Sequence, residues 1–145
     1  GQLADERLGE GAGAVRGRGA LLMMPAMDVL RKRFESPDEQ RSFEKGRFEL
    51  VRLGGLTIGR ATYRPGWKWS THVGPTVGAA LCTVEHVGLV LSGAAAVSFA
   101  DGRVVELSRG TLFYIPNLPH DSWVIGEEDY VSLHLGGAEH YARAR

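Results

Sequence analysis

Four of the five histidines in this chain are spaced so that a small β-barrel would turn them toward one metal ion. They are His72, His86, His120 and His134. His86 precedes a turn glycine, Gly93, by seven residues, and His120 follows a strand-like run that ends in a proline. Imidazole is a common ligand for divalent transition metals. The spacing therefore predicts an all-nitrogen metal site.

The composition describes one ordinary globular domain and excludes several function classes. The chain has 145 residues, and its 17 basic and 17 acidic side chains cancel, so nothing in its charge suggests the basic face that nucleic-acid binding requires. A single cysteine, Cys82, excludes an intramolecular disulfide and favours a reducing, cytoplasmic compartment. We expect Cys82 to be a small buried or interface residue. No apolar run approaches the roughly 20 residues that span a bilayer, so no membrane association is expected.

Short alternating runs separated by turn residues organise most of the chain. We expect residues 1–25 to be a flexible, glycine-rich segment and 26–145 to be one domain. Residues 36–40 are typical of a turn or short helical loop, and 139–144 of a short helical piece. Strands are expected at residues 48–53, 56–63, 85–91, 94–100, 103–107, 111–115, 122–125 and 130–135. This pattern predicts an all-β sandwich or barrel.

Strand alternation tests whether three of the histidines point inward. Each shares a strand face with small or polar neighbours: His134 with Ser132 and Tyr130, His86 with Gly88 and Val90, and His120 with Ser122 and Val124. A polar face on a barrel strand favours an interior that binds something. Glu85 and His140 are expected at the surface.

Residues 64–136 resemble the cupin superfamily, the double-stranded β-helix or jelly roll. The run from His86 to Gly93 has the spacing of the first cupin motif, with histidine where the family has glutamate. The run from Gly110 to Pro116 fits the second motif, and His120 comes one residue earlier than usual. The usual His-x-His pair is absent, since His72 stands alone upstream, and His134 falls where most cupins have no ligand.

Residues 65–75 and 120–126 carry a narrower resemblance, to the cupin-type aromatic polyketide cyclases of bacterial type II pathways such as resistomycin biosynthesis. This resemblance implies a metal-dependent aldol condensation and aromatisation of a poly-β-ketone in antibiotic biosynthesis. It also implies a homodimer, and polyketide synthase components are further candidate partners. Four neutral imidazoles would leave the full charge on one divalent ion per chain and make it a strong Lewis acid. Zinc is expected, although nickel, cobalt or iron would fit the same nitrogens.

Further residues receive expected roles at this site. Asp121 is the candidate catalytic base, with metal-bound hydroxide and Glu85 as alternatives; Asp121 could equally cap the loop or orient a histidine. An aromatic wall for the substrate pocket is expected from Tyr63, Trp67, Trp69, Tyr114 and Trp123.

Two other functions remain open at this point. A cupin dioxygenase acting on a flavonol-like or diketone substrate would use the same fold and histidines, but oxygen-activating iron sites often include a carboxylate that this motif lacks. A non-enzymatic sensor or storage module for a small molecule is the third reading. Oxygen consumption would identify the dioxygenase, and turnover of a polyketone would exclude the binding module.

Overall fold

The computed structural model describes residues 28–144, and within them the barrel forms one compact unit that begins at Lys32. The expected flexible segment 1–25 and its boundary with the domain lie outside the described residues. In the described part of the chain, no helix has both the length and the apolar character needed to cross a bilayer.

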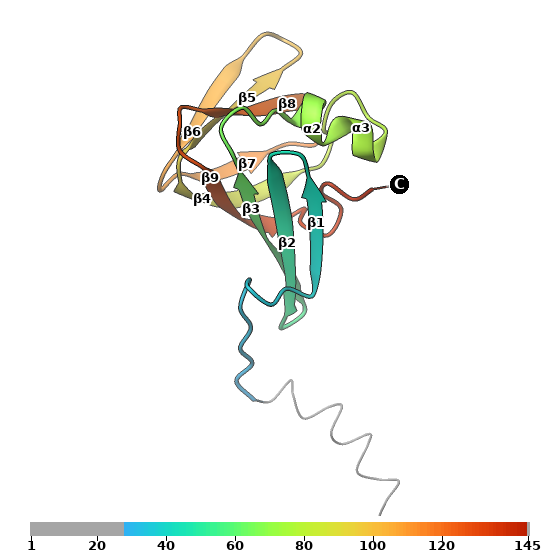
Figure 1. The fold of residues 1–145 in the computed structure, drawn as a ribbon, viewed down its shortest axis with the longest axis vertical. Coiled ribbons are helices and arrows are strands. Elements are labelled where there is room, and N and C mark those ends of the chain that lie inside the picture. Colours follow the sequence, from blue (N-terminus) through green and yellow to red (C-terminus); the bar gives the residue numbers. More distant parts are fainter. Residues whose placement is uncertain (1–27, 145) are drawn as a thin grey trace, which may run out of the picture. The chain divides into compact units, whose positions relative to one another are not determined.

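Two antiparallel sheets make up the barrel (Figure 1). The larger has the strand order β1-β2-β3-β9-β4-β7, and the smaller has the order β6-β5-β8. The strands are β1 (Glu39–Phe43), β2 (Gly46–Leu53), β3 (Leu56–Tyr63), β4 (His86–Ser92), β5 (Ala94–Phe99), β6 (Val104–Ser108), β7 (Leu112–Ile115), β8 (His120–Ile125) and β9 (Tyr130–Gly136). Two single helical turns, α2 (Trp69–His72) and α3 (Gly74–Val77), join β3 to β4. The all-β expectation is confirmed.

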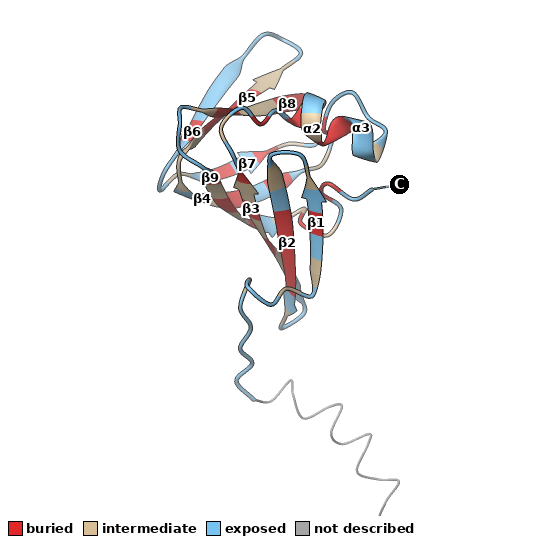
Figure 2. Cartoon of the chain, in the orientation of Figure 1, coloured by how far each residue is buried: buried red, intermediate tan, exposed pale blue. Residues whose placement is uncertain are grey.

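Buried residues lie on strands of both sheets (Figure 2), and their apolar side chains form one cluster. Phe48 and Leu50 on β2 have no exposed surface, and Val97 and Val124 from the smaller sheet belong to the same buried cluster. Strand alternation produces this arrangement, because every second residue faces inward. On β9, for example, Tyr130, Ser132 and His134 are buried, while Val131 and Leu133 are half-buried and Leu135 is exposed.

The structure differs from the sequence-based expectation in three segments. Residues 39 and 40, the end of the turn expected at 36–40, instead begin strand β1, because this strand pairs in register with β2. The alternation of β1 was hidden because the inward-facing residue is Arg41 rather than an apolar one. Residues 69–77 form helical turns, so His72 is on a helix and not on a strand. The C-terminal residues 139–142 form turns rather than a helix.

Candidate metal centre

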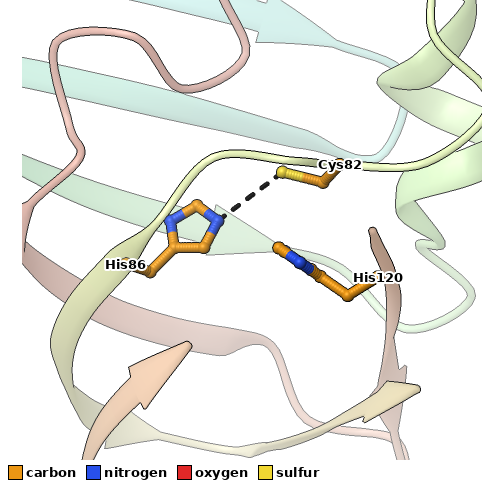
Figure 3. Close-up of side chains that lie close together, drawn as sticks. All are labelled: Cys82, His86 and His120. Atoms are coloured by element: carbon orange, nitrogen blue, oxygen red, sulfur yellow. Dashed lines mark hydrogen bonds between the residues drawn. The ribbon is translucent and has the colours of Figure 1, made fainter. Parts of the chain in front are cut away.

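Three buried side chains converge inside the barrel: Cys82, His86 and His120 (Figure 3). One ligand atom from each lies within 4.8 Å of the other two. The Sγ atom of Cys82 is 3.6 Å from Nε2 of His86. All three residues are at most 3% exposed. One sulfur and two imidazole nitrogens form a donor set that suits zinc.

Backbone pairing holds two of these ligands together. The N–H of Cys82 donates to the carbonyl of His120, and the N–H of His120 donates to the carbonyl of Cys82, both at 2.9 Å. This isolated antiparallel bridge fixes the loop before β4 against the first residue of β8. His86 begins β4 four residues after Cys82, so its inward side chain reaches the same space.

A backbone carbonyl sets the tautomer of His120. Its Nδ1 lies 2.7 Å from the carbonyl oxygen of Leu118. Because a carbonyl only accepts hydrogen bonds, Nδ1 carries the proton and Nε2 keeps its lone pair. Metal-binding histidines commonly donate their second nitrogen in this way, which orients the ring.

His134 lies beside the three convergent ligands but is tied to its own strand. Its ring centroid is 5.3 Å from that of His86, and its Nε2 is 3.1 Å from Oγ of Ser132. The rings of Phe48 and Phe113 meet His134 edge-on at 5.2 and 5.9 Å. The neighbours of the His134 imidazole are therefore three rings and one hydroxyl, from Phe48, His86, Phe113 and Ser132.

Two glycines make this packing possible. Gly59 and Gly88 are the residues paired with His134 on the two neighbouring strands. A Cβ atom at Gly59 would lie 2.2 Å from the ring of Phe48, and one at Gly88 would lie 2.5 Å from the ring of Phe113. Both phenyl rings can therefore reach His134 only because these positions lack side chains.

The interior contains unsatisfied polar atoms. Among the described residues, four buried side-chain nitrogens have no hydrogen-bond partner: Nε1 of Trp67, Nε1 of Trp69, Nδ1 of His86 and Nδ1 of His134. All four residues line one cavity of about 40 Å³, together with Cys82 and His120. Buried polar groups are usually paired, so unpartnered ones in one cavity indicate a missing ligand. An imidazole nitrogen can offer a lone pair to a metal, so the histidines fit a bound ion. An indole N–H is a donor only, so the two tryptophans would need an acceptor such as a water molecule.

Burial keeps the histidines neutral. It lowers the pKa of His86 to about 2, with further contributions from His134 and His120, and it lowers the pKa of His134 to about 4. Burial also lowers the pKa of His120. Neutral imidazoles keep the lone pairs that coordinate a metal. Burial raises the pKa of the Cys82 thiol to about 11, and a bound ion would deprotonate it.

The structure does not bring His72 to the other histidines. Its Nδ1 lies 2.9 Å from the backbone N of Lys68 and 3.1 Å from the carbonyl of the same residue, so the ring folds back onto its own helical turn. His72 is half-buried and is not among the residues that line the cavity. Among the described residues, the convergent group is therefore Cys82, His86 and His120, and His72 lies outside it.

The carboxylate of Asp121, the expected catalytic base, is occupied by structural contacts. Its Oδ1 accepts hydrogen bonds from the backbone N–H groups of Ser70 and Ser122, and its Oδ2 accepts one from the Ser70 hydroxyl at 2.6 Å. Lys68 lies 3.7 Å away. These contacts tie α2 to β8, which favours the capping role over the catalytic one.

The expected aromatic wall divides into two groups. Tyr63, Trp67 and Trp69 line the cavity. Tyr114 is 61% exposed and donates a hydrogen bond to Glu85 on the outer surface. Trp123 faces outward from β8, where Lys68 lies 5.6 Å from its ring centroid. Alternation explains both corrections: the neighbours of Tyr114 on β7 point inward, as do the neighbours of Trp123 on β8.

Two residues of the site were not anticipated as such. Cys82 was expected to be buried but not to be a ligand, although a cysteine four residues before a candidate ligand histidine is a usable signal. Tyr141 lines the cavity, and its ring lies 5.0 Å from that of His86. Nothing in the local sequence of Tyr141 distinguishes it from a surface tyrosine.

Solved structures provide the comparisons with known proteins, since no protein-family model and no curated protein sequence matches the chain. A Rhizobium leguminosarum protein of unknown function is 24% identical, with a TM-score of 0.55 over 76% of this chain and 97% of its own. The polyketide cyclase RemF from Streptomyces resistomycificus is 16% identical, with a TM-score of 0.55 over 77% of this chain and 80% of its own. Oxalate decarboxylase from Bacillus subtilis is 16% identical, with a TM-score of 0.50 over 93% of this chain and 38% of its own.

At these identities the likeness shows the fold alone. The chain has a cupin-type jelly roll, built from two antiparallel sheets around a buried Cys–His–His group.

Proposed function

We propose that this protein is a metal-dependent cyclase that catalyses intramolecular aldol condensation and aromatisation of a poly-β-ketone. One divalent ion per chain is its cofactor, and zinc is favoured because sulfur joins two imidazoles in the donor set. Cys82, His86 and His120 would hold the ion. The observation that carries the proposal is the convergence of these three buried ligand atoms within 4.8 Å of one another.

The side chains around the ligands suit carbonyl chemistry. A bound divalent ion supplies Lewis acidity toward carbonyl oxygens. Tyr63 and Trp67 stack face to face with ring centroids 3.8 Å apart, and both line the cavity. Such flat aromatic walls can orient a poly-β-ketone, and the apolar lining from Val97 and Leu107 excludes water. The polyketide cyclase RemF shares this fold, and residues 65–75 and 120–126 carry the sequence resemblance to cyclases.

Oxygen chemistry remains the alternative function. A cupin dioxygenase would bind iron, nickel or manganese and would consume oxygen with a flavonol-like or diketone substrate. Iron sites of that kind often combine two histidines with a carboxylate. The convergent group found among the described residues contains a thiol in place of a carboxylate, which favours zinc and therefore the cyclase.

Metal analysis of the untagged protein is the first experiment. We expect about one zinc per chain by inductively coupled plasma mass spectrometry, and loss of that zinc in the His120→Ala variant. The His72→Ala variant is the matched control, since it removes an imidazole outside the group, and it should keep its zinc. Stoichiometric iron, nickel or manganese would favour the dioxygenase, and absence of any metal after reconstitution would contradict both proposals.

Turnover then separates the functions. Incubation of the zinc-loaded protein with a synthetic poly-β-ketone should give an aromatic product, detected by its absorbance, without oxygen consumption. If the polyketone is not consumed although zinc is bound to the expected ligands, the cyclase proposal is wrong but the metal-site proposal is not affected.

A second copy of the chain is the partner we propose. The outer face of β4, β7 and β9 exposes the apolar side chains of Val87, Leu91, Leu112, Tyr114 and Leu135. Leu112 is 73% exposed, and Val87 and Tyr114 are direct neighbours across the β4–β7 pair. Contiguous apolar patches of this kind are typical of interaction surfaces. The zero formal net charge leaves little repulsion between copies.

A further inference from the structure

The segment that follows β9, residues 137–142, turns back to the barrel and places one side chain inside it. Tyr141 is 3% exposed and lines the cavity. Its ring stacks on His134 with centroids 5.6 Å apart, and its hydroxyl lies 2.5 Å from that of Tyr63. Tyr141 therefore separates the candidate ligands from the outside.

The cavity that Tyr141 helps to close is too small for an organic substrate. Its volume of about 40 Å³ leaves room for an ion and a few water molecules at most, since one water needs about 10–15 Å³ of such space. A poly-β-ketone, or any ligand of more than a few atoms, can reach the histidines only if part of the wall moves.

Arg41 on β1 holds the segment from within. Its guanidinium donates to three backbone carbonyls of the segment, those of Ala138, Glu139 and Tyr141, the contact to Glu139 at 2.9 Å. Only 8% of its side chain is exposed, and Glu39 balances its charge at 2.6 Å. Inward-pointing charges can blunt an edge strand. Here the guanidinium of Arg41 instead binds one short segment, whose backbone carbonyls accept three hydrogen bonds from it.

The backbone of the segment has a suitable hinge at each end. Gly137 has a φ of +82° directly after β9, and Ala142 has a φ of +52°, a conformation that residues other than glycine rarely adopt. Between them, Glu139 is anchored at the surface by Arg52 at 2.9 Å and Thr57 at 2.8 Å. Contacts to neighbouring side chains, rather than regular secondary structure, hold the segment in place.

A surface groove lies between the C-terminal segment and the loop before β4, where the two could separate. The groove has a volume of about 110 Å³, with His140, Ala142 and Arg143 among its lining on one side and the loop before β4 on the other. Trp69 and Cys82 line both this groove and the inner cavity. At this point the groove and the inner cavity are therefore separated by a thin layer that includes Cys82, itself a candidate ligand.

We propose that segment 137–142 is the entrance gate of the barrel, that Tyr141 closes it and sets the size of the molecules admitted, and that Arg41 is its latch. This proposal depends on the proposed function in one respect only, which is that the barrel contains a binding site that a ligand must reach. Its opening can be measured without metal or substrate, so failure of one proposal is distinguishable from failure of the other.

Cys82, the one cysteine of the chain, reports on the gate. We would measure its reaction with the bulky reagent dithiobis(nitrobenzoate) in the chelator-treated full-length protein, at urea concentrations below the unfolding transition. Arg41→Gln removes the latch and should speed the reaction on the order of tenfold, since hydrogen bonds to a charged group are lost. Tyr141→Phe keeps the ring and loses the hydroxyl bond to Tyr63, and a smaller acceleration is expected.

The control is Arg47→Gln, which removes an arginine from the neighbouring strand whose ion pair is to Glu49. Its reaction rate should match that of the unchanged protein. Opening of a local gate depends weakly on urea, whereas global unfolding depends on it steeply. Wild-type rates in both Arg41→Gln and Tyr141→Phe, or rates that follow the global unfolding equilibrium in every protein, would overturn the proposal. If Arg41→Gln does not fold, Tyr141→Phe decides the outcome by itself.

Discussion

Acid should destabilise the metal-free protein well before its carboxylates titrate. The pKa values of buried His86 and His134 are lowered to about 2 and about 4, from an ordinary value of 6.5. Below about pH 6.5, these two histidines therefore bind protons in the unfolded chain but stay neutral in the folded protein. The stability contributed by these two neutral imidazoles is complete above about pH 6.5 and falls as the pH drops toward 4.

The size of the effect follows from these values. At about pH 5 both folded imidazoles are still neutral, whereas an unfolded histidine is almost fully protonated. Each of the two histidines therefore lowers the free energy of unfolding by about 2 kcal/mol between pH 7.5 and pH 5, since one pKa unit corresponds to about 1.4 kcal/mol. The pair should remove about 4 kcal/mol, and His120 adds a loss of the same sign. Typical domains have only about 5–15 kcal/mol in total, so the loss should be easily measured.

Urea unfolding of the chelator-treated protein at pH 7.5, 6 and 5 tests this prediction. Hydrogen bonds lower the pKa values of the surface carboxyls Asp38, Glu39 and Glu139, from the backbone N–H of Arg52 to Asp38 and from arginine side chains to the other two. Their contribution to stability is therefore lost below about pH 4.5, outside this window. His134→Phe, which suits the surrounding rings, should halve the loss to about 2 kcal/mol. His140→Gln, at an exposed histidine, should keep the full loss. Equal stability at pH 7.5 and pH 5 would refute the reasoning.

Three further predictions concern the ligands, the expected base and the partner. Cys82→Ser should weaken zinc binding by more than the roughly 10–100-fold that is typical when a residue hydrogen-bonded to a metal ligand is changed, measured by competition with a chromogenic chelator; an unchanged affinity would remove the sulfur from the donor set. Asp121→Asn should lower the free energy of unfolding by about 1–3 kcal/mol, because donors from Ser70 lose their charged acceptor, while zinc affinity stays the same. A catalytic Asp121 would instead give normal stability and lost turnover. Leu112→Glu should convert a dimer to a monomer in size-exclusion chromatography with light scattering, and a dimer that persists would place the interface elsewhere.

Strand alternation explains how much of the site could be predicted. It placed His86, His120 and His134 on inward faces, and all three are buried there. The same rule, applied to Tyr114 and Trp123, would have put both outside, because their neighbours supply the inward face. Aromatic character alone was a weaker guide than position within the strand.

Other parts of the site depend on contacts that the local sequence does not encode. The role of Cys82 comes from a two-bond bridge to His120, which is 38 residues away along the chain. Tyr141 enters the cavity because Arg41, 100 residues earlier, binds the carbonyls around it. His72 lies apart from the other histidines because residues 69–72 close a helical turn, which directs the imidazole back to Lys68.

The strand order has a consequence for how the chain folds during translation. β9 is the last of the described strands to be synthesised, yet it lies between β3 and β4 in the larger sheet. Until it emerges from the ribosome, β3 and β4 each present an unpaired edge, and such edges favour aggregation. The nascent chain should therefore depend most on chaperones until residues 130–136 have left the ribosome, because the two parts of the larger sheet that β9 joins stay unfinished until then.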